Sequence, residues 1–384
     1  MAARDLGEVG YWSSVRKIGV EEELLLVDPA NGELANAAGA VLHKHRTERG
    51  GAPPPSPSRD LEGELLRHML ETHTDPSADL AEIGRQLREA RRTAIAAAEE
   101  SGVAVAAVAT APLGSAAPAV SPNPRYERIV QEFGDTGRGA GTLGMHVHVD
   151  VSDDEEGVRV IDGLRPWLPL LTALTSNSPY ASGRDTGYAS WRQQVWTRWP
   201  TSGTAEPYGS AAEYHRVRDT LIRVGAALDE GMLYFDARLS ATYPTVEIRV
   251  ADTCTDLDDA LLAAALARAL VETTAERSDP GEAVRSDLLR AAWWRAARYG
   301  LTGELVHPMS WDLVSAAVAL RALAQAVGPA LASAGDTDLV DDGLSRLATR
   351  GTGARRQRQA FERSGDLRGV VADLVRRTAE AAAE

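Results

Sequence analysis

Three adjacent glutamates, Glu21, Glu22 and Glu23, lead directly into the apolar run from Leu24 to Val27. Side chains alternate between the two faces of a β-strand, so Glu21 and Glu23 would share one face and Glu22 would lie on the other. Two carboxylates beside apolar residues repel each other and lose hydration unless a cation lies between them. A hard divalent cation is the natural candidate. The alternative is an exposed edge strand whose acids face water.

A later segment, Met145 to Val151, also carries ionisable groups on one face. Its strict alternation predicts a strand with His146, His148 and Asp150 on one side and apolar residues on the other. The apolar side would pack in the core, which leaves two imidazoles and a carboxylate available for chemistry. A structural histidine is the alternative interpretation for each imidazole.

A third segment, Thr245 to Val250, places Glu247 and Arg249 on one face. Glu71 adds another acid if the stretch 61–74 is a strand, although its pattern fits a strand and a helix equally. Polar faces of this kind would converge on the concave side of a sheet and form a pocket. Carboxylates with an imidazole suit Mg²⁺ or Mn²⁺ holding nucleotide phosphates, whereas Zn²⁺ prefers a richer His or Cys set. A plain salt bridge is the alternative for Glu247 and Arg249.

Arginines are available to neutralise phosphate or carboxylate oxygens. Arg249, Arg184 and Arg192 have the planar guanidinium that suits bidentate contact. Arg184 lies in a Gly-rich turn and could instead only shape that turn. The sequence contains neither a P-loop nor a Rossmann glycine fingerprint, and no G-x-S-x-G nucleophile motif. A nucleotide would therefore have to be held by metal ions on a sheet.

Composition limits the partners. The 384 residues carry a formal net charge of −14, which argues against nucleic acid and anionic membranes and favours small polar ligands. We find no run of the roughly 20 apolar residues that spans a bilayer, nor a signal-peptide core at the N-terminus. The lone cysteine, Cys254, excludes an intrachain disulfide framework and fits the cytoplasm. A buried structural thiol is favoured over a nucleophile there.

The elements that must position these residues follow from periodicity, caps and turns. Strands are predicted at 15–28, 103–110, 145–151, 233–239 and 245–250. Helices are predicted at 75–100, 125–133, 152–176, 191–199 and 211–230, and throughout from Asp256 to the C-terminus. This order predicts one α+β domain with an antiparallel sheet, in which a core at about 15–255 precedes a helical part at about 256–384.

Several short motifs occur together in one order. They are Gly19-Val20-Glu21-Glu22-Glu23, Leu70-Glu71-Thr72, Gly144-Met145-His146-Val147-His148-Val149, Leu164-Arg165-Pro166-Trp167-Leu168-Pro169-Leu170-Leu171, Asn177-Ser178-Pro179, Gly183-Arg184-Asp185-Thr186-Gly187-Tyr188, Thr245-Val246-Glu247-Ile248-Arg249 and Trp294-Arg295-Ala296-Ala297-Arg298-Tyr299-Gly300. As a set, over roughly residues 15 to 310, they resemble the YbdK-type carboxylate-amine ligases of the glutamate–cysteine ligase type 2 family.

The resemblance implies a glutamine-synthetase-like fold, in which a curved antiparallel sheet forms a funnel and helices pack outside. It implies ATP-dependent amide formation through an acyl phosphate, with ATP and Mg²⁺ (or Mn²⁺) as cofactors and glutamate and cysteine as substrates. Position by position, it assigns metal and ATP-phosphate contacts to Glu21, Glu23, Glu71, His146 and Glu247. It assigns phosphate or substrate contacts to Arg249 and Arg184. Further candidates are Glu64, His148, Arg192 and Arg298.

Two other functions stay open at this point. One is a metal-ATP-dependent phosphotransferase that phosphorylates a carboxylate or guanidino group without a following amine. The other is a non-catalytic relative that binds metabolites. A homodimer is the assembly that we consider, and neither nucleic acid nor membrane is expected as a partner.

Overall fold

The computed structural model describes residues 15–48, 56, 60–114, 119–139, 141–277 and 284–383. An antiparallel sheet of seven strands lies at its centre, with β1 (Ile18–Val27) inside it. The strand order is β2 (Glu62–Gly63), β3 (Met69–His73), β1, β5 (Gly144–Asp150), β9 (Thr245–Asp252) and β8 (Ala237–Leu239), and β4 (Ala104–Ala106) also pairs with β1. All these pairings are antiparallel. The predicted α+β class with an antiparallel sheet is confirmed.

One face of the sheet is covered by helices. They are α2 (Leu80–Glu100), α5 (Asp154–Leu164), α6 (Leu168–Thr175) and α9 (Leu257–Ala275). Glu22 points toward this layer, and its carboxylate accepts two hydrogen bonds from Arg91 of α2, at 3.0 and 2.7 Å. Both side chains are fully buried. The expected division of the three glutamates between two faces is therefore confirmed, because Glu22 is neutralised inside the helical layer.

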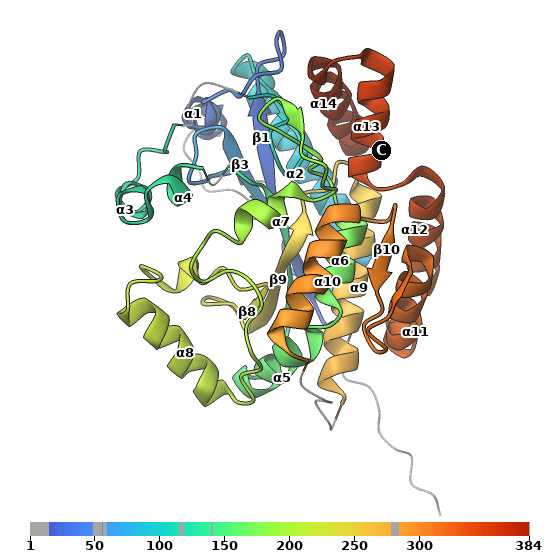
Figure 1. Ribbon diagram of the computed structural model, residues 1–384. Coiled ribbons are helices and arrows are strands. Elements are labelled where there is room, and N and C mark those ends of the chain that lie inside the picture. The colour runs from blue at the N-terminus through green and yellow to red at the C-terminus, as the bar shows by residue number, and fades with distance from the viewer. Residues whose placement is uncertain are drawn as a thin grey trace, which may run out of the picture.

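Shorter elements lie on the other side of the strands, as Figure 1 shows for α3, α4 and α8. They are α3 (Pro124–Phe133), α4 (Asp135–Arg138), α7 (Trp191–Trp196), α8 (Ala211–Arg223) and the 3₁₀ helix η2 (Glu230–Met232). Asn123 begins α3 by accepting a hydrogen bond from the backbone N–H of Arg125. These segments, together with α1 (Ala38–Glu48) and the two-residue strands β6 (Tyr180–Ala181) and β7 (Arg184–Asp185), complete the N-terminal two thirds.

The C-terminal third consists of α10 (Ser286–Tyr299), α11 (Ala316–Ala334), α12 (Thr337–Arg350), α13 (Gly353–Ser364) and α14 (Leu367–Ala383). Figure 1 shows α11 to α14 together on the side of α9 that faces away from α8. The prediction of helix throughout this region is wrong at one place, where β10 (Glu304–Val306) pairs with β11 (Leu313–Ser315). Gly300 ends α10 with φ 53°, and Pro308 lies in the hairpin turn, where it cannot continue a helix.

Among the described residues, α11 alone is long and apolar enough to cross a membrane by length and composition. It packs against α9 and α12, as a helix of a folded domain does. That the whole chain forms one domain remains a prediction.

Candidate active site

The strand register brings the predicted acids and imidazoles to one face of the sheet. In the β1–β3 pair, Glu21 lies opposite His73 and Glu23 lies opposite Glu71. In the β1–β5 pair, Glu21 also lies opposite His146. Directly opposed residues of an antiparallel pair point to the same side. The stretch 61–74 is thus resolved as strand around Glu71, and its acid joins those of β1.

A β-bulge in β9 lies at Arg249. Met145 pairs with Ala251 and Val147 pairs with Ile248, so Arg249 and Val250 of β9 together lie opposite His146. A bulge of this kind re-aims side chains beside a functional site. Glu247 and Arg249 both remain buried here, with 2% and 6% of their surfaces exposed.

Two groups of side chains are close enough to bind one cation each. Glu21, His146 and Glu247 have ligand atoms within 4.8 Å of one another, and so do Glu21, Glu71 and His73. Nδ1 of His146 lies 3.1 Å from Oε2 of Glu21. Nε2 of His146 is buried and has no hydrogen-bond partner among the described residues. Nδ1 is the ring nitrogen that faces the carboxylates of Glu21 and Glu247, and the carboxylate-rich donor set fits Mg²⁺ or Mn²⁺.

Glu247 is less free than Glu21. Arg238 donates two hydrogen bonds to its carboxylate, at 2.6 and 3.1 Å, and Arg249 forms a short ion pair with it. Burial alone would raise the pKa of Glu247, but Arg249, Arg238 and nearby imidazoles hold it well below its usual range. The carboxylate of Glu247 therefore anchors two guanidinium groups at the edge of the candidate metal site.

The remaining carboxylates repel one another. Burial, with the charge of Glu64, raises the pKa of Glu23 to about 7. Burial and four neighbouring glutamates raise the pKa of Glu71 well above its usual value, and burial also raises that of Glu64. Glu21 behaves differently: burial acts to raise its pKa, but hydrogen bonds with three histidines hold it far below its usual range. Excess negative charge of this kind is the environment in which a divalent cation is stable.

Arg192 lies behind this acidic cluster and is 1% exposed. Its Nη2 donates to the backbone oxygen of Arg249 at 3.0 Å, and its guanidinium lies 5.2 Å from the ring of Trp196. A Cβ atom at Gly144 would lie 2.3 Å from Nη2 of Arg192, so the glycine makes room for the guanidinium. The backbone N–H of Gly144 donates to Oε2 of Glu23 at 2.5 Å. The buried arginine is thereby placed against both Glu23 and Arg249.

A cavity of about 160 Å³ opens onto the acidic face. Of the predicted residues, Glu21, Glu23, Glu64, Glu71, His146 and Arg249 line it. Its other wall is aromatic and includes Tyr126, Trp196, Trp199 and Tyr234. The Trp196 and Trp199 rings each contact the Tyr234 ring, with centroids 4.8 and 4.9 Å apart. The arrangement offers cation ligands at one end and stacking surfaces at the other.

Two predicted arginines lie away from this cavity. Arg184 is exposed on β7. The Arg298 guanidinium lies over the rings of Tyr188 and Tyr299, at 5.6 and 5.2 Å. His148 lies at the edge of the site, where its Nε2 is 3.1 Å from Oε1 of Glu21 and its Nδ1 is 3.0 Å from Oγ1 of Thr245. The structure thus brings His148 to the acids but does not bring Arg184 or Arg298 there.

Sequence reasoning missed His73, Arg125 and Arg238. His73 stands two residues after Glu71, so alternation on β3 would have found it once that segment was taken as a strand. Arg238 lies opposite Glu247 in the β8–β9 pair, a relationship that only the register reveals. Arg125 of α3 lines the cavity and pairs with Asp229 at 2.8 Å. Cys254 is a buried free thiol whose pKa is raised by burial, as the structural interpretation predicts.

Comparison with known proteins gives consistent matches along the chain. The model of the family described as glutamate-cysteine ligase family 2 matches residues 17–377. A Nocardioides protein named "Putative glutamate--cysteine ligase 2-1" is 52% identical, over 95% of this chain and 96% of its own. A Streptomyces coelicolor protein named "Putative glutamate--cysteine ligase 2" is 47% identical, over 95% of this chain and 99% of its own.

Solved structures match at the level of the fold. A glutamate–cysteine ligase from Francisella tularensis in complex with AMP has a TM-score of 0.65 and 13% identity, covering 96% of this chain and 89% of its own. A bifunctional glutathione synthetase from Pasteurella multocida has a TM-score of 0.69 and 17% identity, covering 96% of this chain and 52% of its own. These likenesses confirm the predicted glutamine-synthetase-like architecture.

Proposed function

The chain belongs to glutamate-cysteine ligase family 2, which makes it a carboxylate–amine ligase, and we propose that it joins the γ-carboxylate of glutamate to an amino-acid amine at the expense of ATP. Cysteine is the amine that the names of its relatives suggest. The observation that carries the proposal is the convergence of Glu21, Glu71 and His146 with Arg249 around one cavity.

Chemistry explains why such a site is needed. A carboxylate is a poor electrophile at neutral pH. Transfer of the γ-phosphoryl group of ATP to a carboxylate oxygen gives an acyl phosphate and ADP. The amine nitrogen then attacks the acyl carbon, the C–O bond to phosphate breaks, and the amine loses a proton. Amide and inorganic phosphate are the products, and most of the acceleration is expected from positioning and fixed charge.

Each group of residues has a task in this scheme. Glu21, Glu23, Glu71 and His146 would hold Mg²⁺, which when bound supplies positive charge to the phosphate oxygens. Arg249, fixed by Glu247, would contact the transferring phosphoryl group or the activated carboxylate through its planar fork. The aromatic wall formed by Trp196, Trp199 and Tyr234 would exclude water from the acyl phosphate. Cys254 has no part in these steps, since its thiol is buried just after β9, which ends at Asp252, and it does not line the cavity.

Product analysis tests the proposal directly. The protein is incubated with ATP, Mg²⁺ and pairs of amino acids, and mass spectrometry is used to find a condensed product that is lighter by one water. ADP release that requires both an acid and an amine supports the ligase. ADP release with the acid alone and a stable phosphorylated product would identify a phosphotransferase, and binding without ADP release would identify a non-catalytic relative.

We further propose that the protein acts in the cytoplasm, where ATP and amino acids are present and a lone thiol stays reduced. A homodimer is the assembly that we propose to test by light scattering.

A further inference from the structure

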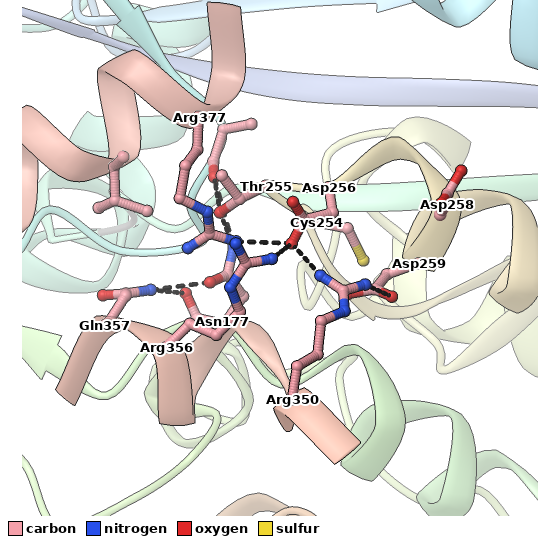
Figure 2. Close-up of polar contacts among 12 residues, drawn as sticks. Asn177, Cys254, Thr255, Asp256, Asp258, Asp259, Arg350, Arg356, Gln357 and Arg377 are labelled. Carbon is pink, nitrogen blue, oxygen red and sulfur yellow. Dashed lines mark hydrogen bonds and ion pairs between the residues drawn. The ribbon is translucent and has the colours of Figure 1, made fainter. Parts of the chain in front are cut away.

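Three C-terminal helices each place an arginine on the same carboxylate, that of Asp256. Arg350 ends α12, Arg356 lies in the first turn of α13, and Arg377 lies in α14. Nη1 of Arg350 and Nη2 of Arg377 donate to Oδ2 of Asp256 at 2.6 and 2.5 Å, and Arg356 also donates to this oxygen. Figure 2 shows the three guanidinium groups gathered around the aspartate. Asp256 is therefore the common attachment point of α12, α13 and α14.

Asp256 has a particular place in the chain. It stands between β9, which ends at Asp252, and α9, which begins at Leu257. Burial acts to raise its pKa, but the three arginines hold the pKa below its usual value, so the carboxylate is charged. Among the described residues, Arg356 has no other acidic partner within ion-pair distance. Removing this one charge would leave Arg356 without an acidic partner among the described residues. It would also leave Arg350 with Asp259 alone and the buried Arg377 with Asp373 alone, which is costly where the charge is buried.

A second connection runs from α13 to the same segment. Nε2 of Gln357 donates to the backbone and side-chain oxygens of Asn177, at 2.9 and 2.8 Å. Nδ2 of Asn177 donates in turn to the backbone oxygen of Thr253 at 2.7 Å and to Oγ1 of Thr255 at 3.0 Å. Figure 2 shows Gln357 and Asn177 beside the arginine cluster. The segment that follows β9 is thus held by both charge and hydrogen bonds.

The hydrogen bonds continue into the site through Asp252. This fully buried residue of β9 accepts from the backbone N–H of Asn177 at 2.8 Å, from Ser178 at 2.7 Å and from Ser190 at 2.8 Å. Ser178 accepts from the backbone N–H of Arg192, and Ser190 caps α7, the helix that carries Arg192. Arg192 donates to the backbone oxygen of Arg249. A continuous path of hydrogen bonds therefore joins Gln357 of α13 to the two buried arginines.

We propose that Asp256 is a positioning residue for the ligase site: it fixes the C-terminal helices on the end of β9 and so holds Arg192 and Arg249 in place. This inference rests on the proposed function, and it gives the C-terminal helices a role in activity although none of their residues lines the active-site cavity. The position of Arg249 should be the most sensitive to the loss of Asp256, because Arg249 lies on β9, the strand whose C-terminal end Asp256 holds.

The test compares Asp256→Asn with Asp336→Asn. Asp336 is a matched control, because it forms a buried ion pair with Arg268 of α9 but, among the described residues, has no hydrogen bond or ion pair with β9 or Asn177. Both variants should lower Tm. In Asp256→Asn, kcat for ADP release should fall about 10-fold per folded molecule with KM for ATP nearly unchanged, since misplacement acts on the transition state. In Asp336→Asn, kcat should stay within about two-fold. Equal kcat values in the two variants would overturn the proposal.

Hydrogen–deuterium exchange provides a readout that does not depend on turnover. Backbone amides of β9 should exchange faster in Asp256→Asn than in Asp336→Asn, and equal exchange would also overturn the proposal. If Asp256→Asn does not fold, Arg356→Met takes its place, because Asp256 is the acidic partner of Arg356 among the described residues and the other two arginines still pair with it. A wild-type protein that makes no amide would refute the proposed function, while the exchange comparison would still decide the role of Asp256.

Discussion

Glu21 lies directly opposite His146 in the β1–β5 pair, with Oε2 of the carboxylate 3.1 Å from Nδ1 of the imidazole. The carboxylate also approaches His148 and His73, and these contacts keep it ionised despite its burial. Glu21 is thus the one acid shared by both candidate cation groups.

We expect Glu21→Gln to reduce ATP turnover by a factor on the order of 100, because a neutral amide cannot match the charge of a carboxylate toward a metal ion. Tm should change little, since the amide still accepts a hydrogen bond from His146. ADP release and thermal unfolding measure the two effects. Glu82→Gln on the exposed side of α2 is the control, and wild-type turnover in Glu21→Gln would contradict the assignment.

Arg249→Lys should lower turnover at least about 10-fold, because an ammonium group does not reproduce the planar fork that faces both Glu247 and the cavity. The lysine can still pair with Glu247, so the protein should remain folded. Steady-state kinetics with ATP and the acid substrate would separate the effects on kcat and KM. A rate close to that of wild type would show that Arg249 only stabilises the sheet.

Arg184→Ala should keep turnover within about two-fold of wild type, because exposed substitutions away from a site usually have small effects. Arg184 is solvent-exposed on β7 and does not line the cavity. The same assay used for Arg249→Lys applies here. A loss of turnover as large as that of Arg249→Lys would instead support the substrate-contacting role that the family resemblance implies for Arg184.

Mg²⁺ should stabilise the protein more at pH 8 than at pH 6. The folded-state pKa of Glu23 is about 7, above its usual 4.5, so the stability linked to this group is complete below pH 4.5 and is lost as pH rises through 7. Protonation competes with metal binding, so Mg²⁺ offsets the loss only where the acids are ionised. The Tm shift on adding Mg²⁺, measured across this range, tests the expectation. A shift that is independent of pH, or equally pH-dependent in Glu23→Gln, would contradict it.

His68 should make the fold sensitive to acid. Burial lowers the pKa of His68 from 6.5 to about 4. The unfolded chain therefore binds the proton first, and the stability linked to His68 is complete above pH 6.5 and is lost as pH falls toward 4. The loss should approach about 3 kcal/mol, at about 1.4 kcal/mol per pKa unit. Urea unfolding at pH 7 and pH 4.5 measures it, and His68→Gln should lose less stability over this interval than wild type.

Alternation along single strands made much of the site predictable. Glu21, Glu23 and His146 were placed on one face because each segment has a period of two, and the sheet confirms that arrangement. Glu71 could be assigned only conditionally, because its segment is apolar at positions that suit either a strand or a helix.

Contacts between residues on different strands could not be predicted from alternation along a single strand. Arg238 reaches Glu247 because β8 pairs with β9 in one register, and Arg249 is turned by a bulge that no local pattern marks. The β10–β11 hairpin was missed because the Ala- and Leu-rich surroundings favour helix, and its turn depends on the closing hydrogen bond from His307 to Asp312.

The absence of a side chain at Gly144 limits which residues relatives can carry at this position. Because even a methyl group there would collide with the guanidinium of Arg192, any replacement of Gly144 must displace that guanidinium from its place behind the acids. Relatives that replace the glycine are therefore expected to hold a different side chain, or a shifted arginine, at the position of Arg192.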